Sequence, residues 1–329
     1  MGVTRWALVG LVGLLVAGCV SPATPPPAAT TTPTRTPAPT VALTHTSVPV
    51  VVPPTPTVAP TPTRPAPTTT PTKAAPGVII TILYDNNEYD ERLTTAWGFS
   101  CLVEGAEKAI LFDTGGDSAT LLSNMRTLGI EPQNVEVVVI SHIHGDHVGG
   151  LAGLLQENHT VTVYLPQSFP QNIKQNTRGT GAEVVEVGGP VEICENVYST
   201  GELGDGIKEQ SLVIETARGL VVITGCAHPG VVNIVRRAKE VVGGEVYLVL
   251  GGFHLGSASR RQVERIIADF RDLGVQKVAP CHCTGDRAIR VFGEEYGEDF
   301  IRAGMGCVIT IGRRTNCQLV PPDSAEGLP

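Results

Sequence analysis

From Gly77 onward the chain alternates short apolar runs with turns rich in glycine or acidic residues. Runs of strand length cover residues 78–83, 100–103, 109–112, 135–141, 161–165, 210–216, 220–224, 246–250, 277–280 and 307–311. Helical periodicity covers residues 119–128, 148–155, 231–242, 260–273 and 286–292. Strands dominate the earlier part and alternate with helices in the later part. This mixture predicts an α/β protein, either a layered αββα sandwich or a three-layer fold.

The first residues of the chain follow another pattern. Arg5 precedes an uncharged run over residues 6–17 that is too short to span a bilayer, which predicts a signal peptide over residues 1–18. The run ends in Val16-Ala17-Gly18-Cys19, which resembles the lipobox of bacterial lipoproteins and implies a lipid on Cys19. A plain secretory signal with an incidental cysteine is the alternative. Both interpretations export the chain.

Residues 19–76 are predicted to be a disordered, lipid-anchored tether. Residues 22–76 contain 17 of the 26 prolines, 17 threonines and no acidic residue. Repeated proline removes backbone donors, and the alternation of Pro, Thr and Ala has no amphipathic period, so this segment cannot bury a core. Its extended reach is on the order of 150 Å. We therefore expect a domain at residues 77–320, followed by a disordered tail at residues 321–329, held outside the bacterial cell membrane through the anchor alone.

Charge is concentrated after the tether. Residues 77–329 contain all 32 acidic residues and 20 of the 24 lysines and arginines, a formal charge of −12. Such a surface repels polyanions, so no nucleic-acid partner is expected and a small-molecule substrate is favoured. The eight cysteines are too sparse for a disulfide scaffold. With Cys19 lipidated an odd number remains, which leaves at least one thiol free, bound to a metal or joined to another chain.

The clearest chemical pattern directly follows the apolar run over residues 135–141. It reads His142-Ile143-His144-Gly145-Asp146-His147, and the glycine permits tight curvature after a buried strand. Neutral imidazoles and a carboxylate suit zinc or another borderline divalent ion. Most histidines beyond the tether follow predicted strands, so we expect them at one edge of the sheets: His142, His144, His147, His228, His254 and His282.

The pattern His142-x-His144-x-Asp146-His147 after a hydrophobic strand resembles the signature of the metallo-β-lactamase superfamily. Six further motifs resemble its 7,8-dihydropterin-6-yl-methyl-4-(β-D-ribofuranosyl)aminobenzene 5'-phosphate synthase-like subfamily of metal-dependent hydrolases: Tyr84-Asp85-Asn86-Asn87, Trp97-Gly98-Phe99-Ser100, Leu111-Phe112-Asp113-Thr114-Gly115, Thr224-Gly225-Cys226-Ala227-His228, Gly251-Gly252-Phe253-His254-Leu255 and Cys281-His282-Cys283-Thr284-Gly285. The resemblance implies an αββα sandwich with a metal site at the strand ends.

The resemblance also implies two divalent ions, with zinc favoured and manganese or iron as alternatives. Two ligand sets are implied: His142, His144 and His228 for the first ion, and Asp146, His147 and His282 for the second.

Other residues receive supporting roles from the same resemblance. Asp113 would orient a ligand histidine from beneath the loop that carries the motif at residues 142–147, called the metal loop below, with turn capping as the alternative. Asp146 would also align the attacking hydroxide, and His254 would protonate the departing oxygen or else cap a helix-bearing loop. Three asparagines are weaker candidates for substrate contacts: Asn86, Asn87 and Asn233.

Two departures from the family pattern concern the ligands. Where the family places a bridging carboxylate, this chain has Cys226, which either bridges as a thiolate, faces away as an inert thiol, or marks a weakly held second ion. The histidine common one strand earlier is absent, so His228 is the expected substitute and Glu209 the alternative. Cys281 and Cys283 should point to opposite sides of an extended segment, so joint ligation of one ion is not expected.

These residues predict a dinuclear metallo-hydrolase, with phosphoester or cyclic ester substrates favoured over lactams. The synthase activity of the subfamily is an alternative, although an exported enzyme has no obvious supply of that intracellular intermediate. A redox protein like the flavodiiron branch is disfavoured because that branch has Glu where this chain has His144. A non-catalytic metal-binding surface domain is the remaining hypothesis.

Overall fold

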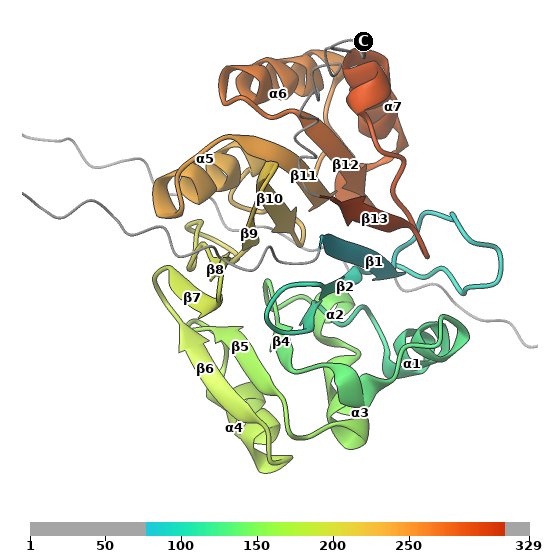
Figure 1. Ribbon diagram of the computed structural model, residues 1–329, viewed down its shortest axis with the longest axis vertical. Coiled ribbons are helices and arrows are strands. Elements are labelled where there is room, and N and C mark those ends of the chain that lie inside the picture. The colour runs from blue at the N-terminus through green and yellow to red at the C-terminus, as the bar shows by residue number, and fades with distance from the viewer. Residues whose placement is uncertain (1–76, 313–329) are drawn as a thin grey trace, which may run out of the picture. The chain divides into compact units, whose positions relative to one another are not determined.

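Two β-sheets packed face to face, with helices on both outer sides, form the part of the chain that the structure describes (Figure 1). The computed structural model describes residues 77–312. Of the two expected architectures, the αββα sandwich is therefore the observed one. The predicted signal peptide, the lipidation site Cys19, the tether at residues 19–76 and the tail at residues 321–329 lie outside the described residues, as do the last residues of the predicted domain.

The first sheet has seven strands in the order β13-β1-β2-β3-β4-β5-β6. Pairing is antiparallel from β13 to β3 and parallel from β3 to β6. In sheet order the strands are β13 Val308–Ile311, β1 Val78–Tyr84, β2 Ser100–Glu104, β3 Ile110–Phe112, β4 Val137–Val139, β5 Thr162–Pro166 and β6 Glu183–Val187.

The second sheet has six strands in the order β12-β11-β10-β9-β8-β7. The three strands β10, β11 and β12 are parallel, so their carboxyl ends meet at one edge. In sheet order the strands are β12 Lys277–Cys281, β11 Val246–Gly252, β10 Gly219–Thr224, β9 Leu212–Thr216, β8 Val197–Ser199 and β7 Val191–Cys194.

Helices connect the strands and cover the outer faces of the sheets. The α-helices are α1 Ser118–Thr127, α2 Gly145–Val148, α3 Leu151–Glu157, α4 Gln171–Gly179, α5 Val231–Val241, α6 Arg260–Asp272 and α7 Asp286–Tyr296. Three short 3₁₀ helices are η1 Pro132–Asn134, η2 His282–Thr284 and η3 Gly297–Asp299. None of the helices within residues 77–312 has the length and apolar character needed to cross a membrane.

The core has three apolar layers, and successive strand residues supply different layers because side chains alternate across a strand. On β10, Val221 and Ile223 belong to the layer between the two sheets, whereas Leu220 and Val222 pack with α5, α6 and α7. A third layer, which includes Leu121, joins the first sheet to α1 and α3. Strands buried on both faces explain the continuous apolar runs in the sequence.

The predicted helix over residues 148–155 is wrong in its bounds. A helical turn, α2, already begins at Gly145, and the chain breaks before α3 at Gly149 and Gly150. A side chain at Gly149 would approach the Gly116 carbonyl oxygen to 2.0 Å, and one at Gly150 would approach the Thr114 carbonyl oxygen to 2.1 Å. The two glycines therefore allow the metal loop to lie directly against the β3–α1 loop.

The helix α4 was not predicted because it carries no apolar stripe. Its buried residues are Lys174 and Thr177. The Lys174 ammonium donates to Glu186 on β6 at 2.6 Å and to the Gln167 carbonyl at 2.6 Å. Strands β6, β7 and β8 were also missed, since β6 has partly exposed valines and acidic residues and the other two are four and three residues long. Polar anchoring of this kind leaves no periodic hydrophobic pattern.

Tyr84 gives the fold a testable dependence on alkaline pH. Its hydroxyl donates to Asp117, the N-cap of α1, at 2.8 Å, and burial followed by this carboxylate raises the pKa of Tyr84 to about 12. In the unfolded chain the phenol ionises near pH 10, so the free energy of unfolding should fall as pH rises from about 10 to about 12. Urea titrations of Tyr84→Phe should show a shallower fall over this range, with a loss of about 1 kcal/mol at neutral pH.

Candidate metal centre

The candidate ligands gather where strands of both sheets end. His142 and His144 follow β4, Asp146 and His147 lie on α2, Cys226 and His228 follow β10, and His282 follows β12. Four of the five non-glycine residues with positive φ in the described part of the chain lie here: Asp113 (58°), Ala227 (61°), His254 (55°) and His282 (49°). Such backbone is unfavourable for residues with a side chain and clusters at functional sites. The fold thus holds this loop cluster in strained conformations.

The first predicted ligand set is brought together around His144. Its Nδ1 lies 3.1 Å from Nε2 of His142 and 3.2 Å from Nε2 of His228. A ring nitrogen carries either one N–H or one lone pair. Nδ1 of His144 can therefore form a good hydrogen bond with only one of these two nitrogens. His144 thus contacts both other members of the set, and His142 and His228 also share the Cys226 sulfur as a neighbour within 4.8 Å.

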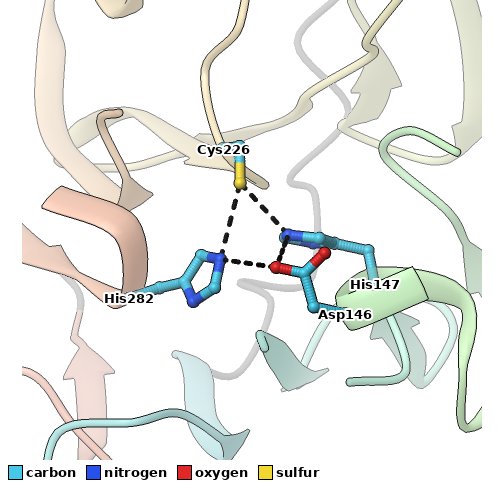
Figure 2. A group of neighbouring side chains, drawn as sticks. All are labelled: Asp146, His147, Cys226 and His282. Atoms are coloured by element: carbon cyan, nitrogen blue, oxygen red, sulfur yellow. Dashed lines mark hydrogen bonds and ion pairs between the residues drawn. The ribbon is translucent and has the colours of Figure 1, made fainter. Parts of the chain in front are cut away.

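The second predicted set is also brought together, and Cys226 joins it (Figure 2). The Cys226 sulfur lies 3.2 Å from Nε2 of His147 and 3.4 Å from Nε2 of His282. The Asp146 carboxylate lies 3.4 Å from Nε2 of His282 and 3.7 Å from Nε2 of His147. These four side chains enclose a small space into which each directs one donor atom.

Cys226 stands between the two sets. Its sulfur lies within 4.8 Å of donor atoms of His142 and His228 as well as of Asp146, His147 and His282. The side chain therefore faces the cluster, and the interpretation of Cys226 as an inert thiol facing away does not describe this structure. It occupies the place where the family pattern would put a bridging carboxylate.

Hydrogen bonds orient the imidazoles so that their free nitrogens face inward. Nδ1 of His147 lies 2.7 Å from Asp113 Oδ2, which accepts, and Nδ1 of His282 lies 3.1 Å from the amide oxygen of Asn86. Nδ1 of His142 lies 2.9 Å from the Ser141 hydroxyl, which itself donates to Asp113. Because each Nδ1 must carry the proton, each Nε2 presents a lone pair to the centre.

The charge states of His142 and His228 suit the same arrangement. Burial, together with the neighbouring imidazoles, lowers the pKa of His142 far below its usual range. The same causes lower the pKa of His228 to about 4. Both rings are therefore neutral at pH 7, which is the form that ligates metals.

The donor set fits a divalent cation of the zinc type. A tetrahedral ion with bonds of about 2.0–2.3 Å holds its donor atoms about 3.3–3.7 Å apart. Four of the six distances among the donor atoms of Asp146, His147, Cys226 and His282 are 3.2–3.7 Å, and all six are within 4.8 Å. Imidazole, carboxylate and thiolate together are typical of zinc, and the thiolate disfavours magnesium or calcium.

Asp113 lies beneath the metal loop and is fully buried. It accepts hydrogen bonds from the Ser141 amide and the Ser141 hydroxyl, both at 2.7 Å, and from His147. One carboxylate thus fixes His147 directly and His142 through Ser141. The sequence pattern did not predict that Ser141 links Asp113 to His142, because this role depends on a contact between residues that are 28 positions apart.

Glu209 is the alternative ligand, but its two oxygens accept hydrogen bonds from backbone amides instead. They accept from the amides of Cys226, Ala227 and His228 at 3.0, 2.8 and 2.8 Å. Burial raises the pKa of Glu209 to about 7. Its role is therefore to position the loop at residues 226–228, a role that depends on the positive φ of Ala227 and cannot be read from spacing.

The three candidate asparagines lie in different surroundings. Asn86 contacts the ligand His282 rather than open space. Asn87 donates to Asp85, which in turn accepts from the His282 amide at 3.1 Å. Asn233 donates to the Pro229 carbonyl at 2.9 Å on the first turn of α5. Asn86 and Asn87 thus support His282, and Asn233 is held by its own helix start, while substrate contacts by these asparagines stay a prediction.

His254 and Cys283 border the cluster. The ring of the exposed His254 lies 4.5 Å from that of His228, centroid to centroid. The Cys283 thiol lies 3.6 Å from the Cys226 carbonyl oxygen, and its sulfur, that of Cys226 and a nitrogen of His254 lie within 4.8 Å of one another. Cys281 instead belongs to the core between the sheets. The two cysteines around His282 thus diverge, as the sequence predicted.

Comparison with known proteins places this architecture. The family model described as the metallo-beta-lactamase superfamily matches residues 98–235. The 7,8-dihydropterin-6-methyl-4-(beta-D-ribofuranosyl)-aminobenzene-5'-phosphate synthase of Methanocaldococcus jannaschii is 30% identical over 280 residues, which cover 70% of this chain and 95% of that protein. The chain belongs to the metallo-β-lactamase superfamily. This match also confirms the predicted likeness to the synthase-like branch of the superfamily.

Solved structures agree with membership of the metallo-β-lactamase superfamily. Tm1679, described as a metal-dependent hydrolase of the β-lactamase superfamily, is 30% identical with a TM-score of 0.61, covering 71% of this chain and 99% of that one. YhfI of Bacillus subtilis, a metallo-β-lactamase fold protein, is 14% identical with a TM-score of 0.54 over 71% of this chain and 99% of that one. The second match shows the shared fold alone.

Proposed function

We propose that the chain is a metal-dependent hydrolase that holds two divalent cations, with zinc favoured. The observation that carries the proposal is the inward orientation of the Nε2 lone pairs of His142, His147 and His282, each enforced by an acceptor at its Nδ1. Two sets of donors meet at Cys226, which gives a place for two neighbouring ions. The superfamily to which the chain belongs and the described activity of Tm1679 support the same conclusion.

The side chains divide the work of hydrolysis between the two donor sets. When bound, the cations supply a nucleophile from water at neutral pH and polarise the substrate oxygen. Asp146 directs a carboxylate oxygen into the same space as His147 and His282, where it can accept a proton from attacking water. His254 lies on the solvent side of His228, where its ring can donate a proton to a departing oxygen.

We favour phosphoesters or cyclic esters over lactams as substrates. A second candidate is the synthase activity after which the Methanocaldococcus relative is named, and the 30% identity over most of both chains favours it.

We also propose that the chain is exported and anchored through lipid on Cys19, on the support of the Val16-Ala17-Gly18-Cys19 pattern. Fractionation of expressing bacteria tests the anchor, since Cys19→Ala should leave the membrane fraction.

Metal content measured together with activity tests the proposed hydrolase. We expect two ions per chain by mass spectrometry of the digested protein. Hydrolysis of bis(4-nitrophenyl) phosphate or a lactone should exceed that of a β-lactam and should disappear on chelation and return with added zinc. One ion or none without turnover would contradict the proposal in favour of a non-catalytic metal-binding domain. Turnover of pterin and aminobenzene ribosyl phosphate alone would favour the synthase.

Cys226→Ser tests the thiolate at the shared position. A serine hydroxyl is a far poorer ligand at neutral pH, so the affinity for one ion should fall by at least about 10- to 100-fold, the range found when only the support of a ligand is removed. In the cobalt-substituted protein the thiolate-to-cobalt charge-transfer absorption should disappear, whereas it should remain in Cys194→Ser, which changes a cysteine on β7. Because the Cys283 sulfur lies beside that of Cys226, retention of the band in Cys226→Ser together with its loss in Cys283→Ser would show that Cys283 rather than Cys226 is the ligand.

A further inference from the structure

Trp97 lies against the metal centre and yet remains largely open to solvent. Its side chain is 59% exposed. Its ring centroid lies 5.0 Å from that of His282, with the planes tilted by 51°. The His282 side chain is itself fully buried and directs its Nε2 to Cys226 and Asp146. The indole therefore covers a ligand on one side and offers apolar surface to solvent beside the candidate site.

Single exposed hydrophobic residues are common and carry no meaning alone. Trp97 differs because its backbone is anchored to the metal loop. The Phe99 amide donates to the Asp146 carbonyl at 3.2 Å, and the Ala96 amide donates to the Asp85 carbonyl at 3.2 Å. Between them Gly98 has φ 148°, and a side chain there would approach the Asp146 carbonyl oxygen to 2.5 Å. These backbone contacts therefore hold the indole in an exposed position, although exposure of an apolar ring to solvent is unfavourable.

The two sides of the centre differ in chemistry. Trp97 contacts His282 of the second donor set, whereas the exposed His254 contacts His228 of the first. A molecule placed across both sets would therefore meet an apolar aromatic face at one end and a polar ring at the other. An aliphatic chain would gain only from buried apolar area on the indole face, whereas a planar ring would add the further gain of stacking.

We propose that Trp97 is a specificity residue that stacks on an aromatic or heteroaromatic ring of the substrate. The inference rests on the proposed hydrolase and narrows its substrates to esters or phosphoesters of a ring-bearing group. Stacking on an aromatic side chain tolerates different kinds of ring, since every planar aromatic ring has a π-face. The gain from one stacked ring corresponds to about a 10- to 100-fold change in dissociation constant.

Two non-hydrolysable probes with the same anionic group test the inference. In calorimetric titrations of the metal-loaded full-length chain, phenylphosphonate should bind about 10- to 100-fold more weakly to Trp97→Ala than to the unsubstituted protein. Trp97→Phe keeps a ring and should retain most of this affinity. Butylphosphonate should lose clearly less affinity in Trp97→Ala than phenylphosphonate does, because it loses apolar contact but no stacking. Equal weakening of both probes in Trp97→Ala would show that Trp97 only supports His282, and unchanged binding of both would exclude stacking; either result overturns the inference.

Fluorescence supplies a second measurement on the same ring. The chain has two tryptophans, Trp6 and Trp97, so Trp6→Phe leaves Trp97 as the sole indole emitter. Phenylphosphonate should alter this emission more than butylphosphonate does; equal responses to the two probes would overturn the inference. Because neither probe is hydrolysed, a positive result stands even if the ester panel shows no turnover, and ester turnover without ring discrimination would retain the hydrolase alone.

Discussion

Replacing His144 with alanine is expected to remove one metal ion and to lower turnover to the background level. Nδ1 of His144 is the nitrogen that lies within 3.2 Å of both His142 and His228, so its loss leaves the first donor set without its common member. Loss of residues that merely orient a ligand costs about 10- to 100-fold in metal affinity or activity, and loss of the ligand itself should exceed this. His144 is only partly buried, so the fold should survive.

Metal stoichiometry and initial rates measured on the same preparation check this result. His159→Ala is the matched control, because His159 is exposed at the end of α3, away from the donor sets. The control should keep both ions and full activity. Unchanged turnover in His144→Ala, with its metal content determined, would count against the assignment of the first donor set and against the proposed hydrolase.

The predictable part of the site came from residues that follow buried strands. Parallel strands bring their carboxyl ends to one edge, which brings His228 and His282 together after β10 and β12; His142 follows β4 of the other sheet, so its place beside them depends on how the sheets pack. Both sheets bury apolar faces against each other, so the ends of their strands are expected to lie close together.

The supporting contacts could not be predicted in the same way. Asn86 and His282 are 196 residues apart, and their contact depends on how the end of β1 lies against the end of β12. Glu209 accepts from the amides of the loop at residues 226–228, where Ala227 adopts a positive φ. Asparagine and glutamate in turns have many ordinary roles, so residue type alone did not distinguish a support from a substrate contact or a ligand.

The loops that carry the candidate ligands combine unfavourable backbone conformations with hydrogen bonds that hold them. The positive φ of Asp113, Ala227, His254 and His282 costs free energy that the apolar core must offset. Each of the three backbone amides at residues 226–228 donates to the buried Glu209, which holds Cys226 and His228 in place before any cation binds. A preformed set of donors loses less conformational entropy on binding than one that must be ordered.

Asp113→Ala is expected to weaken both the fold and the metal site. The carboxylate accepts from the Ser141 amide, the Ser141 hydroxyl and His147, all of them buried, so its removal leaves these donors unpaired. We expect a loss of about 3 kcal/mol in the free energy of unfolding of the metal-free protein. The affinity for metal should fall by about 10- to 100-fold because His147 loses the acceptor that fixes its tautomer.

Two measurements separate these effects. Urea titration of the metal-free chain reports the packing loss, and the further stabilisation by zinc reports affinity, since a ligand stabilises the folded state in proportion to RT ln(1 + [L]/Kd). Asp113→Asn keeps the size of the side chain but not the negative charge, so its loss of unfolding free energy should be smaller while its metal affinity still falls. If zinc stabilised Asp113→Ala as much as the unsubstituted chain, Asp113 would only cap its turn, and the orientation of His147 would have to arise from the imidazole packing around it.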